Sequence, residues 1–214
     1  MNPDPEEKLL ALAGNPNCGK TTLFNAITGA HQHVGNYPGI TVEKKEGFTS
    51  VDGRRLRLVD LPGTYSLTAY SLEELVARDF LVQERPSVVV NIVDASNLDR
   101  NLYLTVQLME LGIPVVIAAE ELGRRLELEV VPTVARSGEG KEVLLETVAR
   151  VACEPRDWRP IHISYGPDID PVLNRMEAEI LEAGFMTEDF PPRWTALKYL
   201  EADEQVLARG DGID

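Results

Sequence analysis

The sequence lacks any long run of uncharged apolar residues, and this lack limits what the chain can be. No window approaches the ~18 such residues that a membrane-spanning helix needs. The N-terminus, MNPDPEEK, is acidic and has no apolar segment of the kind that a signal peptide contains. From these two absences we expect a chain that is soluble as given and carries no secretory signal.

Cysteine is scarce, and cationic residues are outnumbered. Cys18 and Cys153 are the only two cysteines and cannot form a disulfide framework, so we expect a reduced, cytosolic setting. The 21 Lys and Arg residues face 35 Asp and Glu residues, which gives a net charge of -14. Nucleic acids and anionic membranes both attract clustered cations, so this balance argues against either as a partner.

Short β-type runs alternate with helical patterns over residues 1–153. Such alternation predicts an α/β fold with a mostly parallel six-stranded sheet that is covered by helices on both faces. The turn at Asp52-Gly53 predicts a hairpin over residues 41–60, which adds one antiparallel edge strand. Residues 30–40 are predicted to be a loop. The predicted strands are residues 9–13, 41–49, 54–60, 87–93, 114–119 and 128–132, and the helices are 20–27, 71–84, 96–112 and 140–152. Residues 71–74, SLEE, look like a capping box that opens the second of these helices.

The composition changes after Cys153. Pro155 and Pro160 mark a linker, and Asp170-Pro171 is typical of a helix start. A second helix is predicted over residues 192–207. The pattern predicts two domains, 1–153 for nucleotide binding and 154–214 as a helical module, which docks through apolar residues at helical spacing. Those of the second helix are Trp194, Leu197 and Leu200.

Residues 14–21, GNPNCGKT, match the phosphate-binding pattern G-x-x-x-x-G-K-[ST] between a predicted strand and a predicted helix. In this context backbone N–H groups converge on phosphate oxygens, and the helix dipole adds to the attraction. Lys20 would reach the β- and γ-phosphates, and the Thr21 hydroxyl would bind Mg²⁺. The predicted phosphate-binding residues are Gly14, Asn15, Pro16, Asn17, Cys18, Gly19, Lys20, Thr21 and Thr22.

Two further segments complete the predicted site. Asp60 ends a strand, where it can support Mg²⁺, and Gly63 follows in D-x-x-G, where its N–H can reach a γ-phosphate. The loop that ends in Pro38-Gly39-Ile40-Thr41 suits a switch whose threonine binds Mg²⁺ when a γ-phosphate is present. The predicted Mg²⁺ ligands are Thr21, Thr41 and Asp60, and Gly39 would contact the nucleotide.

Four blocks, GNPNCGKTTLFN, VGNYPGITVEKKEG, VDLPGTYSL and VDASNLDRNLYLTVQLMELG, resemble the cytosolic GTPase domain of the FeoB-type ferrous iron transporters of prokaryotes. RWTALKYLEADE is similar to the helical module that follows that domain and inhibits nucleotide dissociation. The resemblance covers nearly the whole chain. It implies a Ras-like P-loop GTPase fold, hydrolysis of GTP to GDP with Mg²⁺, and a place on the cytoplasmic side of the inner membrane. It also implies a transmembrane permease C-terminal to this chain in the full-length protein, and it is compatible with a homo-oligomer.

The sequence lacks the usual catalytic helpers. Ras-like enzymes place a glutamine just after D-x-x-G to orient the attacking water, whereas Thr64-Tyr65 follow Gly63 here. No arginine occurs in residues 30–41, so slow turnover is expected, with water held by backbone groups or another side chain. The resemblance implies that K⁺ supplies the missing charge and is held in part by Asn17. The predicted catalytic residues are Lys20, Asn17, Thr41 and Gly63.

The base-recognition pattern is broken. The resemblance predicts Asn-x-x-Asp directly after residues 113–119, but the chain reads AAEELG over residues 118–123. The simplest explanation is that the segment carrying this pattern is missing from the given sequence. Either the segment is deleted from the chain, or it is disordered without nucleotide and therefore does not appear; disorder is favoured. The loop TVARSG at 133–138 is similar to the family's S-A-[KR] element, and the N–H of Ala135 could reach guanine O6. Val134, Ala135 and Arg136 are therefore predicted to contact the nucleotide.

Two other functions compete with this interpretation. GTPases of ribosome or tRNA maturation share G-N-P-N-x-G-K, and a nucleotide-gated interaction switch would need little hydrolysis.

His31 and His33 could suggest an iron site, but a pair at i, i+2 without a thiol or carboxylate is more typical of a solvated loop. At a helix N-terminus the pKa of Cys18 could be lowered, yet a small filling side chain is the simpler explanation.

Overall fold

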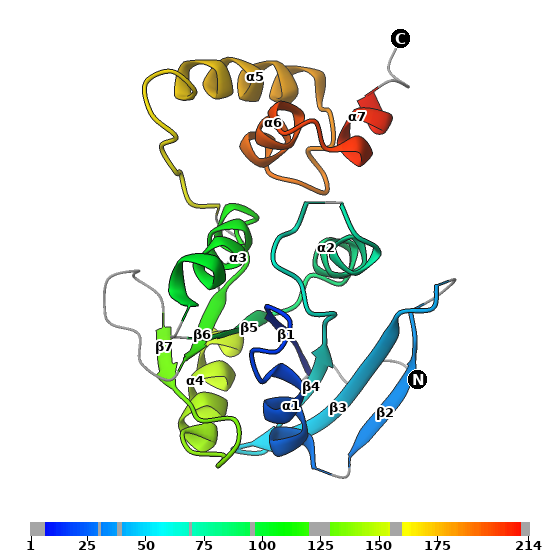
Figure 1. The fold of residues 1–214 in the computed structure, drawn as a ribbon, viewed down its shortest axis with the longest axis vertical. Coiled ribbons are helices and arrows are strands. Elements are labelled where there is room, and N and C mark those ends of the chain that lie inside the picture. Colours follow the sequence, from blue (N-terminus) through cyan, green and yellow to red (C-terminus); the bar gives the residue numbers. More distant parts are fainter. Residues whose placement is uncertain are drawn as a thin grey trace.

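A seven-stranded sheet runs through the larger part of the molecule in the order β2-β3-β4-β1-β5-β6-β7 (Figure 1). The computed structural model describes residues 7–29, 31–37, 40–68, 70–94, 97–119, 129–154 and 160–210. Strands β4, β1, β5, β6 and β7 are parallel, whereas β3 is antiparallel to both of its neighbours. The strands are β1 (Lys8–Gly14), β2 (Gln32–Asn36), β3 (Glu43–Val51), β4 (Arg54–Asp60), β5 (Val88–Val93), β6 (Val115–Ala119) and β7 (Glu129–Pro132).

The sheet therefore has seven strands, where the sequence predicted six. The additional strand is β2, which lies within the segment predicted to be a loop and pairs with β3 from Gln32↔Gly47 to Asn36↔Glu43. Consequently β3, although antiparallel as predicted, is not the edge strand. A mostly parallel sheet in an α/β fold is confirmed.

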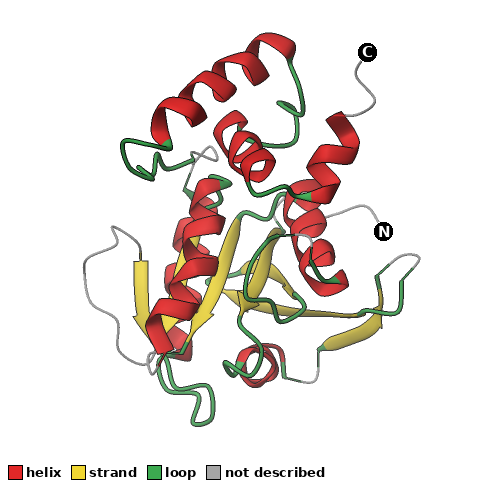
Figure 2. Ribbon diagram, turned by 45° about the horizontal axis from the view of Figure 1, so that its top comes forward, coloured by secondary structure: helices red, strands yellow, loops and turns green. Residues whose placement is uncertain are grey.

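Helices cover both faces of the sheet (Figure 2). One apolar core joins α2 and α3 to the sheet, and a second core joins α1 and α4 to the opposite face. All six residues of β5 are buried, as expected for a central parallel strand with helices on both sides. These helices are α1 (Lys20–Thr28), α2 (Leu72–Glu84), α3 (Leu98–Glu110) and α4 (Lys141–Cys153).

Local signals define several helix ends. The backbone N–H of Gly29 bonds to the carbonyl of Asn25 and closes α1. The Ser71 hydroxyl accepts a hydrogen bond from the N–H of Glu74 at 3.1 Å, as predicted for the start of α2. The Glu74 carboxylate does not complete a capping box with Ser71, because it accepts hydrogen bonds from Ser66 Oγ and the N–H of Tyr70.

Three helices form a separate group at one end of the molecule, over α2 and α3 (Figure 1). The single helix predicted over residues 192–207 is wrong, since a break at 201–203 divides it into α6 and α7. Ala202 has a left-handed φ of 55°, and the Asp203 carboxylate accepts hydrogen bonds from Gln205 and Val206 at the start of α7. Of the predicted stripe, Trp194 is buried but Leu200 is 48% exposed. The three helices are α5 (Asp170–Ala183), α6 (Pro192–Leu200) and α7 (Glu204–Gly210).

The helical group shares its core with α2. Phe190, Trp194 and Val206 belong to the same buried cluster as Val76 and Phe80 of α2. The Phe190 and Trp194 rings stack with their centroids 4.4 Å apart. This common core fixes α6 and α7 directly against the α2 side of the sheet domain.

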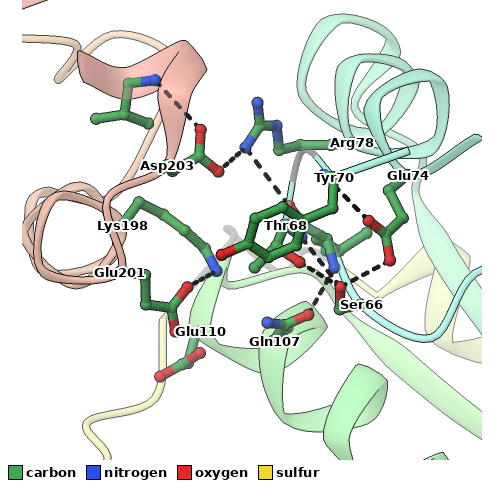
Figure 3. Close-up of polar contacts among 12 residues, drawn as sticks. Ser66, Thr68, Tyr70, Glu74, Arg78, Gln107, Glu110, Lys198, Glu201 and Asp203 are labelled. Carbon is green, nitrogen blue, oxygen red and sulfur yellow. Dashed lines mark hydrogen bonds and ion pairs between the residues drawn. The ribbon is translucent and has the colours of Figure 1, made fainter. Parts of the chain in front are cut away.

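A buried ion pair crosses the same contact (Figure 3). Arg78 of α2 donates to Asp203 Oδ2 at 2.7 Å, with the two side chains only 3% and 1% exposed. The Arg78 guanidinium also lies over the Trp194 ring. Because such a charge has no access to water, removing its partner is costly even where the pair as a whole contributes little net stability.

We expect Asp203→Ala to lower the free energy of unfolding by about 3–5 kcal/mol, because the Arg78 charge would stay buried without its partner. Urea unfolding followed by circular dichroism measures this loss. Asp189→Ala is the matched control, because Asp189 pairs with Arg209 at 3.5 Å on the surface and its removal should cost less than about 1 kcal/mol. Equal losses of unfolding free energy in the two variants would contradict the conclusion that Asp203 compensates the buried charge of Arg78.

Candidate nucleotide-binding site

The loop between β1 and α1 has the backbone shape of a phosphate cradle. Asn17 and Gly19 have left-handed φ values of 66° and 87°, and the N–H of Cys18 bonds to the carbonyl of Asn15 at 3.3 Å. Successive residues of this kind turn their N–H groups toward one concave side, where an anion can bind. The loop opens directly into α1, so the positive end of the helix dipole faces the same place.

Gly14 ends β1 where no side chain fits. A Cβ at this position would lie 2.7 Å from both the carbonyl oxygen of Ile92 and the Sγ of Cys18, and φ is 154°. The close approach of β5 to the loop therefore requires glycine here. Cys18 is half-buried against this glycine, and burial raises the pKa of its thiol, which supports the filling role over a reactive one.

Two adjoining hollows surround the loop. The hollow on the phosphate side has a volume of about 480 Å³, and the one on the opposite side has about 530 Å³. Asn17, Gly19 and Thr22 line both. The phosphate hollow is completed by Asn15, Pro16, Lys20, Thr21 and Gly63, so the structure brings these predicted residues together.

Asp60, Lys20 and Thr21 form a polar cluster beside the phosphate hollow. Lys20 Nζ lies 2.5 Å from Asp60 Oδ1, and the Thr21 hydroxyl donates to Asp60 Oδ2 at 3.3 Å. The Lys20 and Asp60 side chains are only 10% and 6% exposed. A hydroxyl and a carboxylate side by side are the hard oxygen ligands that Mg²⁺ prefers, so these residues fit the ion.

The D-x-x-G segment packs directly on the phosphate loop. A Cβ on Gly63 would lie 3.1 Å from the Cα of Pro16, and the N–H of Thr64 bonds to the carbonyl of Gly14 at 3.2 Å. These contacts place the Gly63 backbone at the wall of the phosphate hollow.

Thr41 does not line either hollow. It is exposed in the turn before β3, and Gly39 lies outside the described residues. Nearby, Tyr37 is anchored by its N–H to the carbonyl of Val42 at 3.0 Å and by an edge contact with Phe80. The structure therefore does not unite Thr41 with Thr21 and Asp60, as the predicted Mg²⁺ site requires, and these three ligands stay a prediction.

Val134, Ala135 and Arg136 line the second hollow, and their contact with a base stays a prediction. A Cβ on Gly19 would lie 3.3 Å from the Cβ of Ala135, so this loop lies against the phosphate loop. Residues 120–128, where the Asn-x-x-Asp pattern breaks, lie outside the described residues.

Asp94, which the predicted site did not include, also lines this hollow, as does Thr133, the first residue of the base-side loop. Both directly follow a strand, β5 and β7, and ligands of parallel sheets bind at the carboxyl ends of strands. Their position was the signal that could have identified them.

His31 and His33 bring no further metal ligands together. Among the residues that the structure describes, no group of three or more His, Cys, Asp or Glu side chains could hold a metal ion. Within the same residues, no helix has both the length and the apolarity that crossing a bilayer requires.

The order of the sheet, the phosphate cradle and the adjacent D-x-x-G segment define a Ras-like G domain joined to a helical domain. The family model described as "Ferrous iron transport protein B" matches residues 8–120, and the one described as "FeoB cytosolic helical domain" matches residues 165–212. The chain belongs to the FeoB family of ferrous iron transport proteins.

Individual relatives agree with this assignment. An Fe(2+) transport protein A/FeoB fusion protein of Porphyromonas gingivalis is 44% identical over 92% of this chain and 25% of its own length. Crystal structures of the cytosolic domain of T. maritima FeoB are 34% identical. The GDP form I has a TM-score of 0.88, with 99% of this chain and 88% of that one covered. The GMPPNP form has a TM-score of 0.85, with 97% and 87% covered. The chain spans about a quarter to a third of the length of the curated relatives it matches.

We expect Gly14→Ala to destabilise the fold and to weaken GDP binding at least tenfold, because the new methyl group meets the Ile92 carbonyl. Thermal unfolding and titration with fluorescent GDP measure the two effects. Gly166→Ala is the control: it has a left-handed φ of 98° but nothing within 4 Å of its Cβ. If Gly14→Ala lost no more stability and GDP affinity than Gly166→Ala, the close approach of the Ile92 carbonyl would not be the reason for glycine at position 14.

Proposed function

We propose that this chain is the GTP-binding and GTP-hydrolysing cytosolic part of a prokaryotic ferrous iron transporter and that it regulates a transmembrane permease in the same full-length protein. The gathering of Lys20, Thr21 and Asp60 beside a loop with inward-turned amides carries this proposal. The GDP and GMPPNP forms of the T. maritima relative support guanine nucleotides as ligands. We assign residues 1–153 to the G domain and 154–214 to the helical module.

The cluster suggests how the nucleotide would change the site. In the structure the Lys20 ammonium neutralises Asp60 at 2.5 Å. A bound polyphosphate would attract the ammonium, and Mg²⁺ on Thr21 and Asp60 would replace its charge beside the carboxylate. Lys20 is therefore proposed to exchange one anionic partner for another when the nucleotide binds.

Hydrolysis would depend on the backbone and on a monovalent cation. Thr64 and Tyr65 occupy the positions after Gly63, so no glutamine side chain is present there to orient water. Asn17 lines both hollows, and its amide oxygen suits a K⁺ ion, which would neutralise charge that develops on the phosphates. Slow, K⁺-stimulated turnover is the expected behaviour.

The helical module is proposed to slow nucleotide release. Asp203 binds Arg78, which also donates to the carbonyl of Leu67 at 3.5 Å, and the N–H of Leu67 bonds to Gln107 of α3 at 2.6 Å (Figure 3). Leu67 follows Gly63 by four residues. Through Arg78 the module thus restrains the segment whose movement would open the phosphate hollow.

A nucleotide-gated switch with little hydrolysis is the second candidate, favoured by the absent glutamine. Release of phosphate from GTP separates it from an enzyme. A role in ribosome or tRNA maturation is less compatible with the net charge of -14.

Calorimetric titration tests the nucleotide itself. We expect GDP and GTP to bind at least tenfold more tightly than ATP, because Val134 and Ala135 line the hollow that we assign to the guanine base. An intact mass measured on the same sample would show whether the purified chain contains residues after Ala119 that the given sequence lacks. No binding of guanine nucleotides at millimolar concentration would overturn the proposal.

The role of the monovalent ion has its own test. We expect several-fold faster phosphate release in KCl than in NaCl, because Asn17 would hold the larger ion beside the phosphates. Asn17→Ala should remove the difference while retaining GDP binding. Equal wild-type rates in the two salts would rule out the K⁺ role.

A further inference from the structure

Arg100, at the start of α3, contacts both the phosphate loop and the residues that follow D-x-x-G. Its guanidinium lies 3.7 Å from the centre of the Tyr65 ring, two residues after Gly63. Its backbone carbonyl accepts a hydrogen bond from Asn15 Nδ2 at 3.4 Å. Asn15 belongs to the phosphate loop and is buried, so one residue of α3 joins that loop to the D-x-x-G segment.

The segment that Arg100 touches is otherwise fixed on its inner side. The N–H of Thr64 bonds to the Gly14 carbonyl, and the Thr64 hydroxyl bonds to the Ser66 carbonyl. Thr64 and Ser66 are buried, whereas the Tyr65 ring points outward and is partly exposed. Stacking of Arg100 on that ring holds the segment from the outside.

Such a restraint matters for a site without a catalytic glutamine. If backbone N–H groups orient the attacking water, the water can be no better placed than the backbone of Gly63, Thr64 and Tyr65. Fixing the Tyr65 ring restricts the positions of these groups, because only two side-chain torsions, χ1 and χ2, separate the ring from its own peptide. Arg100 does not line the phosphate hollow, so a direct role as an arginine finger does not follow from its position.

We propose that Arg100 is a positioning residue for GTP hydrolysis, which acts by stacking on Tyr65 and thereby fixing the backbone that holds the attacking water. This role rests on the GTPase function proposed above. The planar guanidinium is essential to it, because an ammonium on the flexible stem of lysine cannot stack in the same way.

The test compares Arg100→Ala with the wild-type chain in single-turnover and steady-state phosphate release. A cation–π contact at an exposed site corresponds to a factor of about two to five. We therefore expect kcat to fall about two- to fivefold while the dissociation constants of GDP and GTP change less than twofold. The backbone carbonyl that binds Asn15 remains in this variant, and Arg100 is exposed, so folding should be unaffected.

Variants of the partner ring separate positioning from a general structural effect. Tyr65→Phe keeps the ring face and should lose less kcat than Tyr65→Ala, which should reproduce the loss seen for Arg100→Ala. The double variant Arg100→Ala/Tyr65→Ala should lose no more than either single variant, because both remove one contact. Arg100→Lys should behave like Arg100→Ala. Arg175→Ala, an exposed arginine of α5, serves as the control.

Three results would overturn the proposal. An unchanged kcat in Arg100→Ala beside an active wild type would remove the role of Arg100 and leave the GTPase function intact. Additive losses in the double variant would show that Arg100 acts through something other than Tyr65. A wild-type chain that releases no phosphate in KCl with Mg²⁺ would overturn both the positioning role and the proposed hydrolysis.

Discussion

The Asp60 carboxylate is the group on which the site depends, since it holds Lys20 and Thr21 at the start of α1. Its place follows from strand pairing: β1 and β4 are parallel, with Leu12 opposite Asp60, so the end of β4 lies beside the phosphate loop. A shift of one residue would turn Asp60 to the other face of the sheet and leave Lys20 with no counter-charge there. The register of two buried strands thus determines the chemistry of the hollow.

The carboxyl end of β4 is also connected to the helical module, by a series of packing contacts and hydrogen bonds between residues far apart in the sequence. Gly63 and Thr64 pack on the phosphate loop, Leu67 bonds to Gln107 and Arg78, and Arg78 binds Asp203. Each step joins a rigid element to the next, because Arg78 and Gln107 are buried on helices. A change at the phosphate hollow and a change at the module therefore act on one short segment, and each can bias the other.

The sequence predicted what depends on local pattern. The phosphate loop, the β4 strand and the cap at Ser71 are all encoded within a few neighbouring residues. Strand β2 was missed because QHVGN contains glycine and no apolar alternation, so only pairing with β3 makes it a strand. The break at Ala202 and the Arg78–Asp203 pair were missed for a similar reason: the partners lie 125 positions apart, and the pairing exists only in the folded chain.

The Arg100–Tyr65 contact is another feature that local pattern does not encode. No glutamine directly follows D-x-x-G and no arginine occurs in residues 30–41, yet α3 brings Arg100 onto Tyr65 from outside both segments. Where backbone amides orient water, the rate is controlled by whatever holds that backbone, and this need not touch the nucleotide. Any partner that presses on α3 or on the helical module could then change turnover while leaving nucleotide affinity nearly the same. In a regulatory GTPase domain of the kind proposed here, this separation would let the lifetime of the GTP state be tuned independently of its formation.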